Sequence, residues 1–167
     1  MTMYRRQFLL RSTALLLAGG AVSPHGVAKE SPAIAALGKS QLIYLSPIVS
    51  GGKPSACHGE VWFVQHNGEV FVSTQHDAWR AEAIRRGFKR AKIWIGEFGA
   101  WKRAKGRYLS APYLELEGRL ETDQQVFNAV LEKFGHKYAA EWGSWGPKFR
   151  NGLNDGSRVM LRYTISS

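Results

Sequence analysis

Cysteine is nearly absent from this chain of 167 residues, with Cys57 as its single example. One thiol excludes an internal disulfide and a zinc site built from clustered thiolates. The five histidines have no spacing that would place two metal ligands on one helix face, so no metal site is expected. Cys57 is interpreted as an inert thiol, with an intermolecular disulfide or a reactive thiol as alternatives. A chain of this kind must rely on its hydrophobic core for stability.

Acidic residues are also scarce. The chain has 13 Asp and Glu against 23 Lys and Arg, which gives a formal net charge of +10. This balance favours anionic partners: phosphate groups, acidic cofactors, nucleic acid or lipid head groups. The rest of the composition is that of a globular domain, with 44% hydrophobic and 22% charged residues. Six tryptophans leave aromatic surface to spare for a ligand or partner.

The apolar stretch at residues 8–22 is too short, and too interrupted by Arg11, to be a comfortable membrane span. It follows a basic start and precedes small residues, which is the three-part layout of a secretory signal. Residues 1–28 are therefore interpreted as a signal peptide, with cleavage expected after Ala28 or Ser23.

The start of that segment is more specific. Arg5-Arg6 followed by Gln7-Phe8-Leu9 resembles the twin-arginine export signal. That resemblance implies a partner, the twin-arginine export machinery, and a periplasmic or extracellular location. Because the route carries folded proteins, it also favours a mature domain that holds a cofactor. Ordinary unfolded export and an uncleaved anchor are the alternatives.

Residues 29–40 are interpreted as a linker and residues 41–167 as one domain with a mainly β (α+β) pattern. Asn67-Gly68 predicts a two-residue hairpin turn, because both residues readily take positive φ. Alternation of polar and apolar residues within 113–117 predicts strands with one wet face, typical of an antiparallel sheet or barrel. Strands are predicted at residues 42–49, 60–65, 69–73, 91–98, 107–120 and 158–164.

Two helices are predicted beside these strands. Asp77 is expected to cap a short helix at 78–86, and Thr122 or Asp123 to cap a second one. The second has an apolar stripe that runs from Val126 to Phe134. Residues 141–156 are expected to be irregular.

The order of these elements over residues 41–165 resembles the pyridoxamine 5'-phosphate oxidase-like split barrel, an FMN-binding family. That resemblance implies an antiparallel split β-barrel with about two flanking helices. Four motifs carry the resemblance: Gly52-Lys53-Pro54 before Val61-Trp62-Phe63-Val64, Phe71-Val72-Ser73-Thr74 before Ala78-Trp79-Arg80, Leu116-Glu117-Gly118-Arg119, and Arg158-Val159-Met160-Leu161-Arg162.

The resemblance also implies roles for individual residues. Thr74 and Arg80 would hold the phosphate of FMN, by charge-assisted hydrogen bonds at a helix start. The isoalloxazine ring would lie against Glu60, Val61, Trp62 and Phe63. Supporting positions would be Ser73, Trp79, His76 and Lys53. The plainer alternatives are a solvated charge for Arg80, an edge hydroxyl for Thr74 and core packing for the aromatics.

The chain departs from the family pattern in two places. Residues 56–60 contain no Arg, although many members place one at the start of the second strand, and residues 99–106 form a basic insertion. The function implied is a flavin-dependent oxidoreductase that moves hydride to or from a small organic substrate. Its cofactor would be FMN (alternatively a deazaflavin), bound in a homodimer. The alternatives are a non-catalytic flavin- or haem-binding barrel and a basic barrel that binds nucleic acid or the cell envelope. Nucleic acid is not expected for an exported protein.

Overall fold

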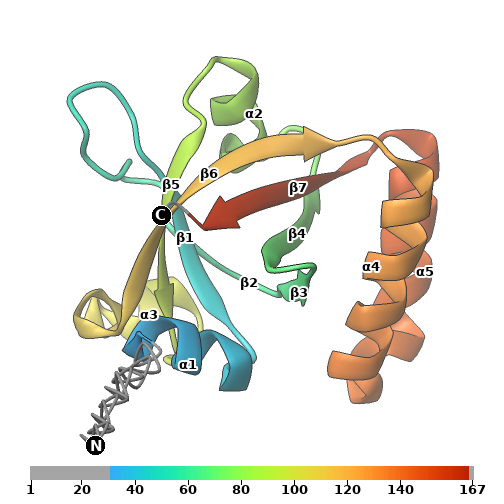
Figure 1. Ribbon diagram of the computed structural model, residues 1–167, viewed down its shortest axis with the longest axis horizontal. Helices are drawn as coiled ribbons and strands as arrows, with labels where there is room; N and C mark the ends of the chain where they lie inside the picture. The colour runs from blue at the N-terminus through green and yellow to red at the C-terminus, as the bar shows by residue number, and fades with distance from the viewer. Residues whose placement is uncertain (1–30, 166–167) are drawn as a thin grey trace, which may run out of the picture.

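The structure is a computed structural model that describes residues 31–165, so the predicted signal peptide lies outside the described residues. Seven strands form one sheet flanked by five α-helices (Figure 1). The strands are β1 (Ile43–Pro47), β2 (Gly59–Val61), β3 (Val64–His66), β4 (Glu69–Gln75), β5 (Arg90–Ile95), β6 (Tyr113–Glu121) and β7 (Arg158–Ile165). The helices are α1 (Pro32–Lys39), α2 (Trp79–Arg85), α3 (Trp101–Ala104), α4 (Gln124–Lys137) and α5 (Ala139–Asp155), with a 3-10 turn η1 (Arg107–Ser110).

The sheet curls until its two edges approach each other. Its strand order is β2-β1-β5-β6-β7-β4-β3, and every neighbouring pair is antiparallel. The edge strands β2 and β3 lie at opposite ends of this order, although only Trp62 and Phe63 separate them in the chain. The result is a half-barrel, open along the seam between β2 and β3. The predicted antiparallel split β-barrel is confirmed, with five helices in the described part instead of two. The strand expected at 60–65 is divided in two by the seam.

The hairpin predicted at Asn67-Gly68 is confirmed. Asn67 has φ 51° and Gly68 has φ 77°, the positive values that a two-residue turn between twisted strands requires. The turn joins β3 to β4 with His66 opposite Glu69. It also sets the register that places Ser73 and Thr74 at the far end of β4.

Two hydrophobic clusters hold the half-barrel together. The inside of the curl is filled by side chains from most strands and from α1, including the fully buried Phe63, Leu116 and Leu161. A second cluster joins the sheet to the helix pair α4 and α5, which stand side by side at one flank of the sheet (Figure 1). Phe134 and Phe149 are the central contacts of that cluster. Every helix within residues 31–165 is too short or too polar to traverse a lipid bilayer.

Residues 141–156 are not irregular, which corrects the prediction: they lie almost wholly within helix α5. Gly143, Gly146, Pro147 and Gly152 make this segment a poor helix former. Packing outweighs that weakness. A Cβ on Gly146 would lie 2.8 Å from the Trp142 indole, so the missing side chain is what lets that ring fold back against its own helix. The tertiary contacts that stabilise α5 have no signature in local periodicity.

Three further expectations need correction. The strand predicted at 107–120 begins only at Tyr113, because residues 107–110 form the 3-10 turn η1. The segment interpreted as a linker contains helix α1, capped by Ser31, whose Oγ accepts a hydrogen bond from the Ile34 N–H at 3.2 Å. Leu37 of this helix is 1% exposed and belongs to the core. Asp77 does not cap α2, because the helix begins one residue later than expected, with Ala78 at the cap position and no side-chain bond. The predicted cap at Asp123 is confirmed, since its carboxylate accepts from the N–H groups of Gln125 and Val126.

Arg162 on β7 joins two carboxylates from neighbouring strands. Its guanidinium donates to Glu69 Oε2 at 2.7 Å and to Glu121 Oε2 at 2.9 Å. Hydrogen bonds from Arg162 lower the pKa of Glu69. Burial acts to raise the pKa of Glu121, but the backbone N–H of Asp123 and the Arg162 guanidinium outweigh it and lower the pKa. Both carboxylates are therefore more acidic in the folded chain than in the unfolded one.

Replacing Arg162 with Met should lower the free energy of unfolding at pH 7 by about 1–3 kcal/mol, because two largely buried carboxylates lose a charged partner. A depressed carboxylate pKa contributes stability above the unfolded pKa, and that contribution is lost as pH falls through the folded pKa. Urea melts of both proteins should therefore converge between pH 7 and pH 3. Lys89→Met, at an exposed site, is the control. A difference that stays constant over this range would contradict the assignment.

Candidate functional site

A pocket of about 480 Å³ opens at the seam of the half-barrel. Its walls come from β2, the end of β4, the start of α2, the middle of α5 and the start of β7. The predicted site residues that meet there are Glu60, Val61, Trp62, Ser73, Thr74 and Arg80. The other lining residues are Leu42, Gln75, Ala78, Trp145, Phe149 and Arg158.

Arg80 is held in place by the end of β4. Its Nη1 donates a hydrogen bond to Thr74 Oγ1 at 2.7 Å, which joins the two residues predicted to hold a phosphate. Backbone of β2 lies directly beneath the guanidinium: a Cβ on Gly59 would be 2.5 Å from Arg80 Nη2. A glycine at this strand position is therefore what allows the guanidinium to approach β2 so closely.

Arg158 repeats this arrangement on the opposite wall. Its Nε donates to Ser73 Oγ at 3.2 Å, and its guanidinium carbon lies 4.5 Å from the centre of the Phe149 ring. The side chain crosses α5 at Gly152, where a Cβ would clash with the methylene stem of Arg158. Two arginines thus approach the adjacent hydroxyls Ser73 and Thr74, each over a glycine.

The lining of the pocket has an excess of positive charge, with Arg80 and Arg158 against the single carboxylate of Glu60. Burial lowers the pKa of Arg80, against the smaller effects of the Tyr163 hydroxyl and the Glu60 carboxylate. Burial, and then the charge of Arg80, lowers the pKa of Arg158. Within residues 31–165 neither guanidinium forms an ion pair with a carboxylate. A bound anion would relieve both the desolvation and the mutual repulsion.

The other side of the pocket is aromatic. Trp62 is stacked on Tyr138 with ring centres 4.3 Å apart, and Trp145 meets it edge-on at 5.9 Å. Trp145 is 40% exposed, which is high for a tryptophan beside a buried cluster. The pocket therefore combines a positively charged end with a partly open aromatic wall, two features that suit a planar ring carrying a phosphate.

Glu60 faces the pocket from β2 and also contacts the basic insertion. Its Oε2 accepts a hydrogen bond from the Trp101 N–H, at the start of α3, at 3.0 Å. The insertion at 99–106 is thereby attached to the strand beside Arg80. None of its residues lines the pocket.

Four predicted site residues lie elsewhere. Phe63 is fully buried at the seam, and its N–H donates to the Tyr138 hydroxyl at 2.9 Å. Trp79 turns away from the pocket, and its Nε1 donates to Ser55 Oγ at 3.2 Å. Lys53 is exposed in the turn after β1. His76 is exposed just beyond β4 and lines a different pocket.

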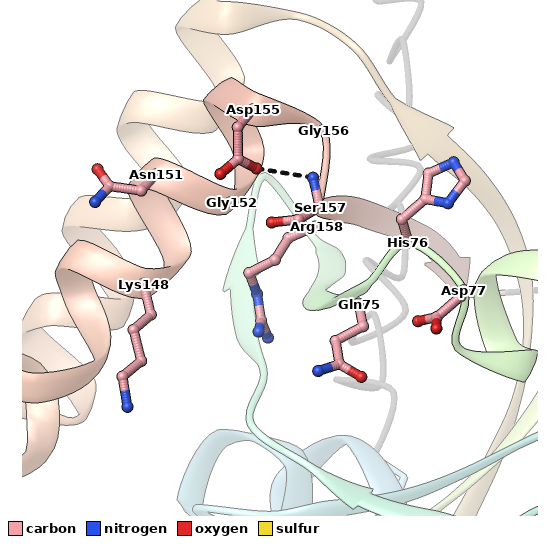
Figure 2. Close-up of a pocket in the computed structure, with 10 residues that line it drawn as sticks. All are labelled: Gln75, His76, Asp77, Lys148, Asn151, Gly152, Asp155, Gly156, Ser157 and Arg158. Atoms are coloured by element: carbon pink, nitrogen blue, oxygen red, sulfur yellow. Dashed lines mark hydrogen bonds between the residues drawn. The ribbon is translucent and has the colours of Figure 1, made fainter.

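That second pocket, of about 670 Å³, adjoins the first and shares Gln75 and Arg158 with it (Figure 2). Figure 2 shows that Gln75, Arg158 and Lys148 extend toward the same side, whereas His76 extends away from them. The Asp155 carboxylate accepts a hydrogen bond from the Ser157 N–H at 2.8 Å. The lining includes two acidic and two basic residues, so this pocket lacks the charge imbalance of its neighbour.

Comparison with known proteins identifies the fold. No family model matches the chain, and no curated protein sequence matches it. Among solved structures, a candidate pyridoxamine 5'-phosphate oxidase from Listeria innocua aligns with a TM-score of 0.52 and 15% identity, over 80% of this chain and 90% of that one. The haem storage protein HutZ from Vibrio cholerae aligns with a TM-score of 0.55 and 15% identity, over 80% and 87%. Campylobacter jejuni ChuZ gives 0.58 and 9%, over 79% of this chain and 50% of that one.

The fold is that of the pyridoxamine 5'-phosphate oxidase-like split barrels. At these identities the likeness establishes the split barrel alone, and the chemistry of the pocket has to be argued from its own residues.

Several lining residues of this split barrel were not predicted as site residues. Arg158, Phe149 and Trp145 lie 70 or more positions along the chain from Ser73 and Thr74, and β7 and α5 bring them to the pocket. Gly59 and Gly152 do not line the pocket, but each leaves the room that one of the two arginine side chains occupies. The start of the closing strand at Arg158 was predicted, but pairing of β7 with β4 is what places it beside Ser73.

Replacing Gly59 with Ala should displace the Arg80 guanidinium without removing a charge. The new methyl group meets the far end of a flexible side chain, so the split barrel should keep its stability to within about 1 kcal/mol. Loss of the aligned bond to Thr74 should weaken binding of a phosphate-bearing ligand about tenfold. Gly143→Ala, where a Cβ meets nothing within 4 Å, is the control. Unchanged affinity for FMN would contradict this account of how Arg80 is positioned.

Proposed function

We propose that the seam pocket binds a flavin through its phosphate, and that the protein is an FMN-dependent oxidoreductase, with a deazaflavin as the alternative cofactor. One observation carries the proposal: two guanidinium groups, Arg80 and Arg158, line one pocket beside two hydroxyls, and neither has a carboxylate partner among the described residues. A phosphate monoester has about −1.5 to −2 charge at neutral pH and accepts several hydrogen bonds.

The residues present fit FMN chemically. Thr74 already accepts the hydrogen bond that fixes Arg80, so the guanidinium is oriented before any ligand binds. Ser73 does the same for Arg158. Prior orientation of charged donors reduces the conformational entropy lost on binding. The aromatic wall of Trp62 and Trp145 offers a partly exposed surface for a flat heterocycle.

A flavin, when bound, supplies the hydride chemistry, and the protein supplies binding, orientation and electrostatics. In this chain Arg80 and Arg158 would hold the phosphate, and Trp62 would limit the access of water to one side of the ring. No proton-transfer residue is assigned, because the pocket includes Glu60 alone as a titratable carboxylate, and its Oε2 accepts the Trp101 N–H.

Export and dimerisation are parts of the proposal that rest on the sequence. The pair Arg5-Arg6 and the apolar residues after it support export by the twin-arginine route to the periplasm or beyond. A homodimer follows from the resemblance to the split-barrel family. The exposed Leu109 and Tyr113, each 51% exposed, offer apolar surface for such an interface. Light scattering of the purified protein would test the dimer.

A non-catalytic carrier of haem or flavin is the second candidate. Two arginines that share a pocket would pair with the two propionates of haem as readily as with one phosphate. The haem storage protein HutZ has the same fold. Addition of haemin followed by an absorption spectrum tests for a haem carrier, because the Soret band of haemin shifts and sharpens when a protein binds it.

The test of function begins with an absorption spectrum of the purified protein and a titration with FMN. The proposal predicts flavin absorption bands that stay with the protein through gel filtration. It also predicts that the protein with bound FMN oxidises a reduced nicotinamide at a higher rate than free FMN does. Flavin that binds without any oxidation of the nicotinamide would support a non-catalytic flavin carrier. A protein that takes up neither FMN nor a deazaflavin, and binds haemin instead, would refute the flavin proposal.

A further inference from the structure

A second concentration of positive charge lies where α1, β3 and α4 meet, away from the seam pocket (hereafter the flavin pocket, after its proposed ligand). These elements enclose a pocket of about 490 Å³. Its basic lining residues are Lys39 at the end of α1 and, on the last turns of α4, Lys133, His136 and Lys137. The remaining lining residues are uncharged, so no carboxylate lines this pocket.

Lys137 is the most unusual member of this group. Its ammonium nitrogen lies 3.4 Å from the centre of the Phe63 ring and 5.5 Å from that of Tyr138. Phe63 is the buried residue of the seam. Within residues 31–165 the ammonium group has no hydrogen bond or ion pair to a protein oxygen, so the aromatic faces are its nearest partners. A half-buried ammonium in this position has donors available for a ligand.

The acidic side chains near this pocket either accept a hydrogen bond from another residue or lie outside the pocket lining. Glu97 acts on Lys137 from a distance, and its Oε1 accepts the Gln41 N–H at 3.0 Å. Glu132 lies 3.7 Å from His136 on the exposed face of α4. Glu141 lines a neighbouring hollow and not this pocket. In the part of the chain that the structure describes, few carboxylates therefore lie close enough to balance the charge of these four basic residues.

The basic pocket connects with the flavin pocket through that neighbouring hollow, of about 470 Å³. The hollow shares Leu42 and Trp62 with the flavin pocket. It shares Gln41, His136 and Lys137 with the basic pocket. The pockets thus form a series along the seam, with basic residues at both ends and Trp62 between them.

We propose that the pocket between α1, β3 and α4 is a second anion site, which binds the carboxylate or phosphate group of a small organic molecule through Lys137, Lys133, His136 and Lys39. Its position at the far end of the Trp62 wall places the remainder of such a molecule along the hollow that leads to the first pocket. This site does not depend on whether a flavin occupies the first one.

The pH dependence of this site follows from Lys137. Burial lowers its pKa from the usual 10.5 to about 8, and the charge of Glu97 opposes that effect. Anion binding should be strongest below pH 8 and should weaken as the ammonium group loses its proton above it. Lys39 and Lys133 face the same pocket, so binding should weaken and not vanish at pH 9. A bound anion should in turn raise the pKa of Lys137.

The test is a titration of the full chain with inorganic phosphate in one arm and succinate in the other, at constant ionic strength. Lysine side-chain NMR signals report which residue responds. The proposal predicts a saturable shift of the Lys137 signal in at least one arm. Lys137→Met should weaken that binding about tenfold or more, detected at the signals of Lys133 and Lys39. Lys105→Gln, in the exposed basic insertion, should leave it unchanged.

Arg80→Ala separates this site from the flavin pocket, because it should abolish tight FMN binding while the phosphate or succinate response at Lys137 remains. Thermal melts establish that each variant is folded, and Lys133→Gln with His136→Gln provides a second route if Lys137→Met is unstable. A Lys137 signal that fails to saturate with either anion, or a response that chloride reproduces at equal ionic strength, would overturn the proposal.

Discussion

Replacing Arg80 with alanine should weaken FMN binding about 10- to 100-fold. The guanidinium lies between Thr74 and the backbone of Gly59, where burial lowers its pKa, and within residues 31–165 it forms no ion pair with a carboxylate. A charge-assisted hydrogen bond contributes about 1.5–3 kcal/mol, and each 1.4 kcal/mol is a factor of ten in affinity. Flavin fluorescence quenching measures the dissociation constant.

Two controls separate loss of this contact from loss of structure. Arg86→Ala removes a charge from the exposed face just past α2, so its effect on FMN affinity should be less than about threefold. Arg80→Lys keeps the charge and loses the planar fork, so it should give an intermediate affinity. Affinity for riboflavin should stay the same in all of these variants. An Arg80→Ala protein that melts normally and binds FMN as tightly as before would exclude Arg80 from the site.

Replacing Tyr138 with Phe should lower the free energy of unfolding by about 1–3 kcal/mol. The Tyr138 hydroxyl accepts the buried Phe63 N–H at 2.9 Å and lies 2.8 Å from the Phe63 carbonyl oxygen and 2.9 Å from that of Gln41. It therefore satisfies backbone groups at the seam, where β2 and β3 do not pair with each other. Burial raises the pKa of Tyr138, so the hydroxyl keeps the proton that the carbonyl groups accept.

Urea denaturation measures this effect, and Tyr113→Phe is the matched control because Tyr113 is 51% exposed. Because Trp62 stacks on Tyr138 and precedes Phe63, the variant should also loosen the aromatic wall of the pocket. A weaker FMN affinity should accompany the loss of stability. Equal stability of Tyr138→Phe and Tyr113→Phe would mean that the seam does not depend on this hydroxyl.

The features that the sequence predicted best are those whose cause is local. The Asn67-Gly68 turn needs two positive φ angles, and the Asp123 cap needs one short carboxylate before an amphipathic helix. Helix α5 could not be predicted in this way, because its glycines and Pro147 are unfavourable in isolation and only contacts with α4 and β7 compensate. The cap expected at Asp77 was wrong because α2 begins one residue later than expected, with Ala78 at the cap position.

The site was predictable in part. Thr74 and Arg80 are six positions apart, so a strand followed by a short helix brings them together, as the resemblance to the split barrels implied. Arg158 approaches Ser73 from 85 positions away through the pairing of β7 with β4. A single sequence gives no signal for that pairing. In the sequence, Gly59 and Gly152 look like ordinary turn or helix-breaking residues. Their role becomes visible only when the structure places Arg80 and Arg158 against them.

The central claim is that Arg80 and Arg158 recognise a flavin by its phosphate. The most direct measurement is the ratio of the dissociation constants of riboflavin and FMN, determined with the unaltered protein in the same buffer. The account predicts that FMN binds at least about a hundredfold more tightly, because the two guanidinium groups would contact the phosphate, which riboflavin lacks. Equal affinity for the two flavins would contradict it, even if both bind in the seam pocket.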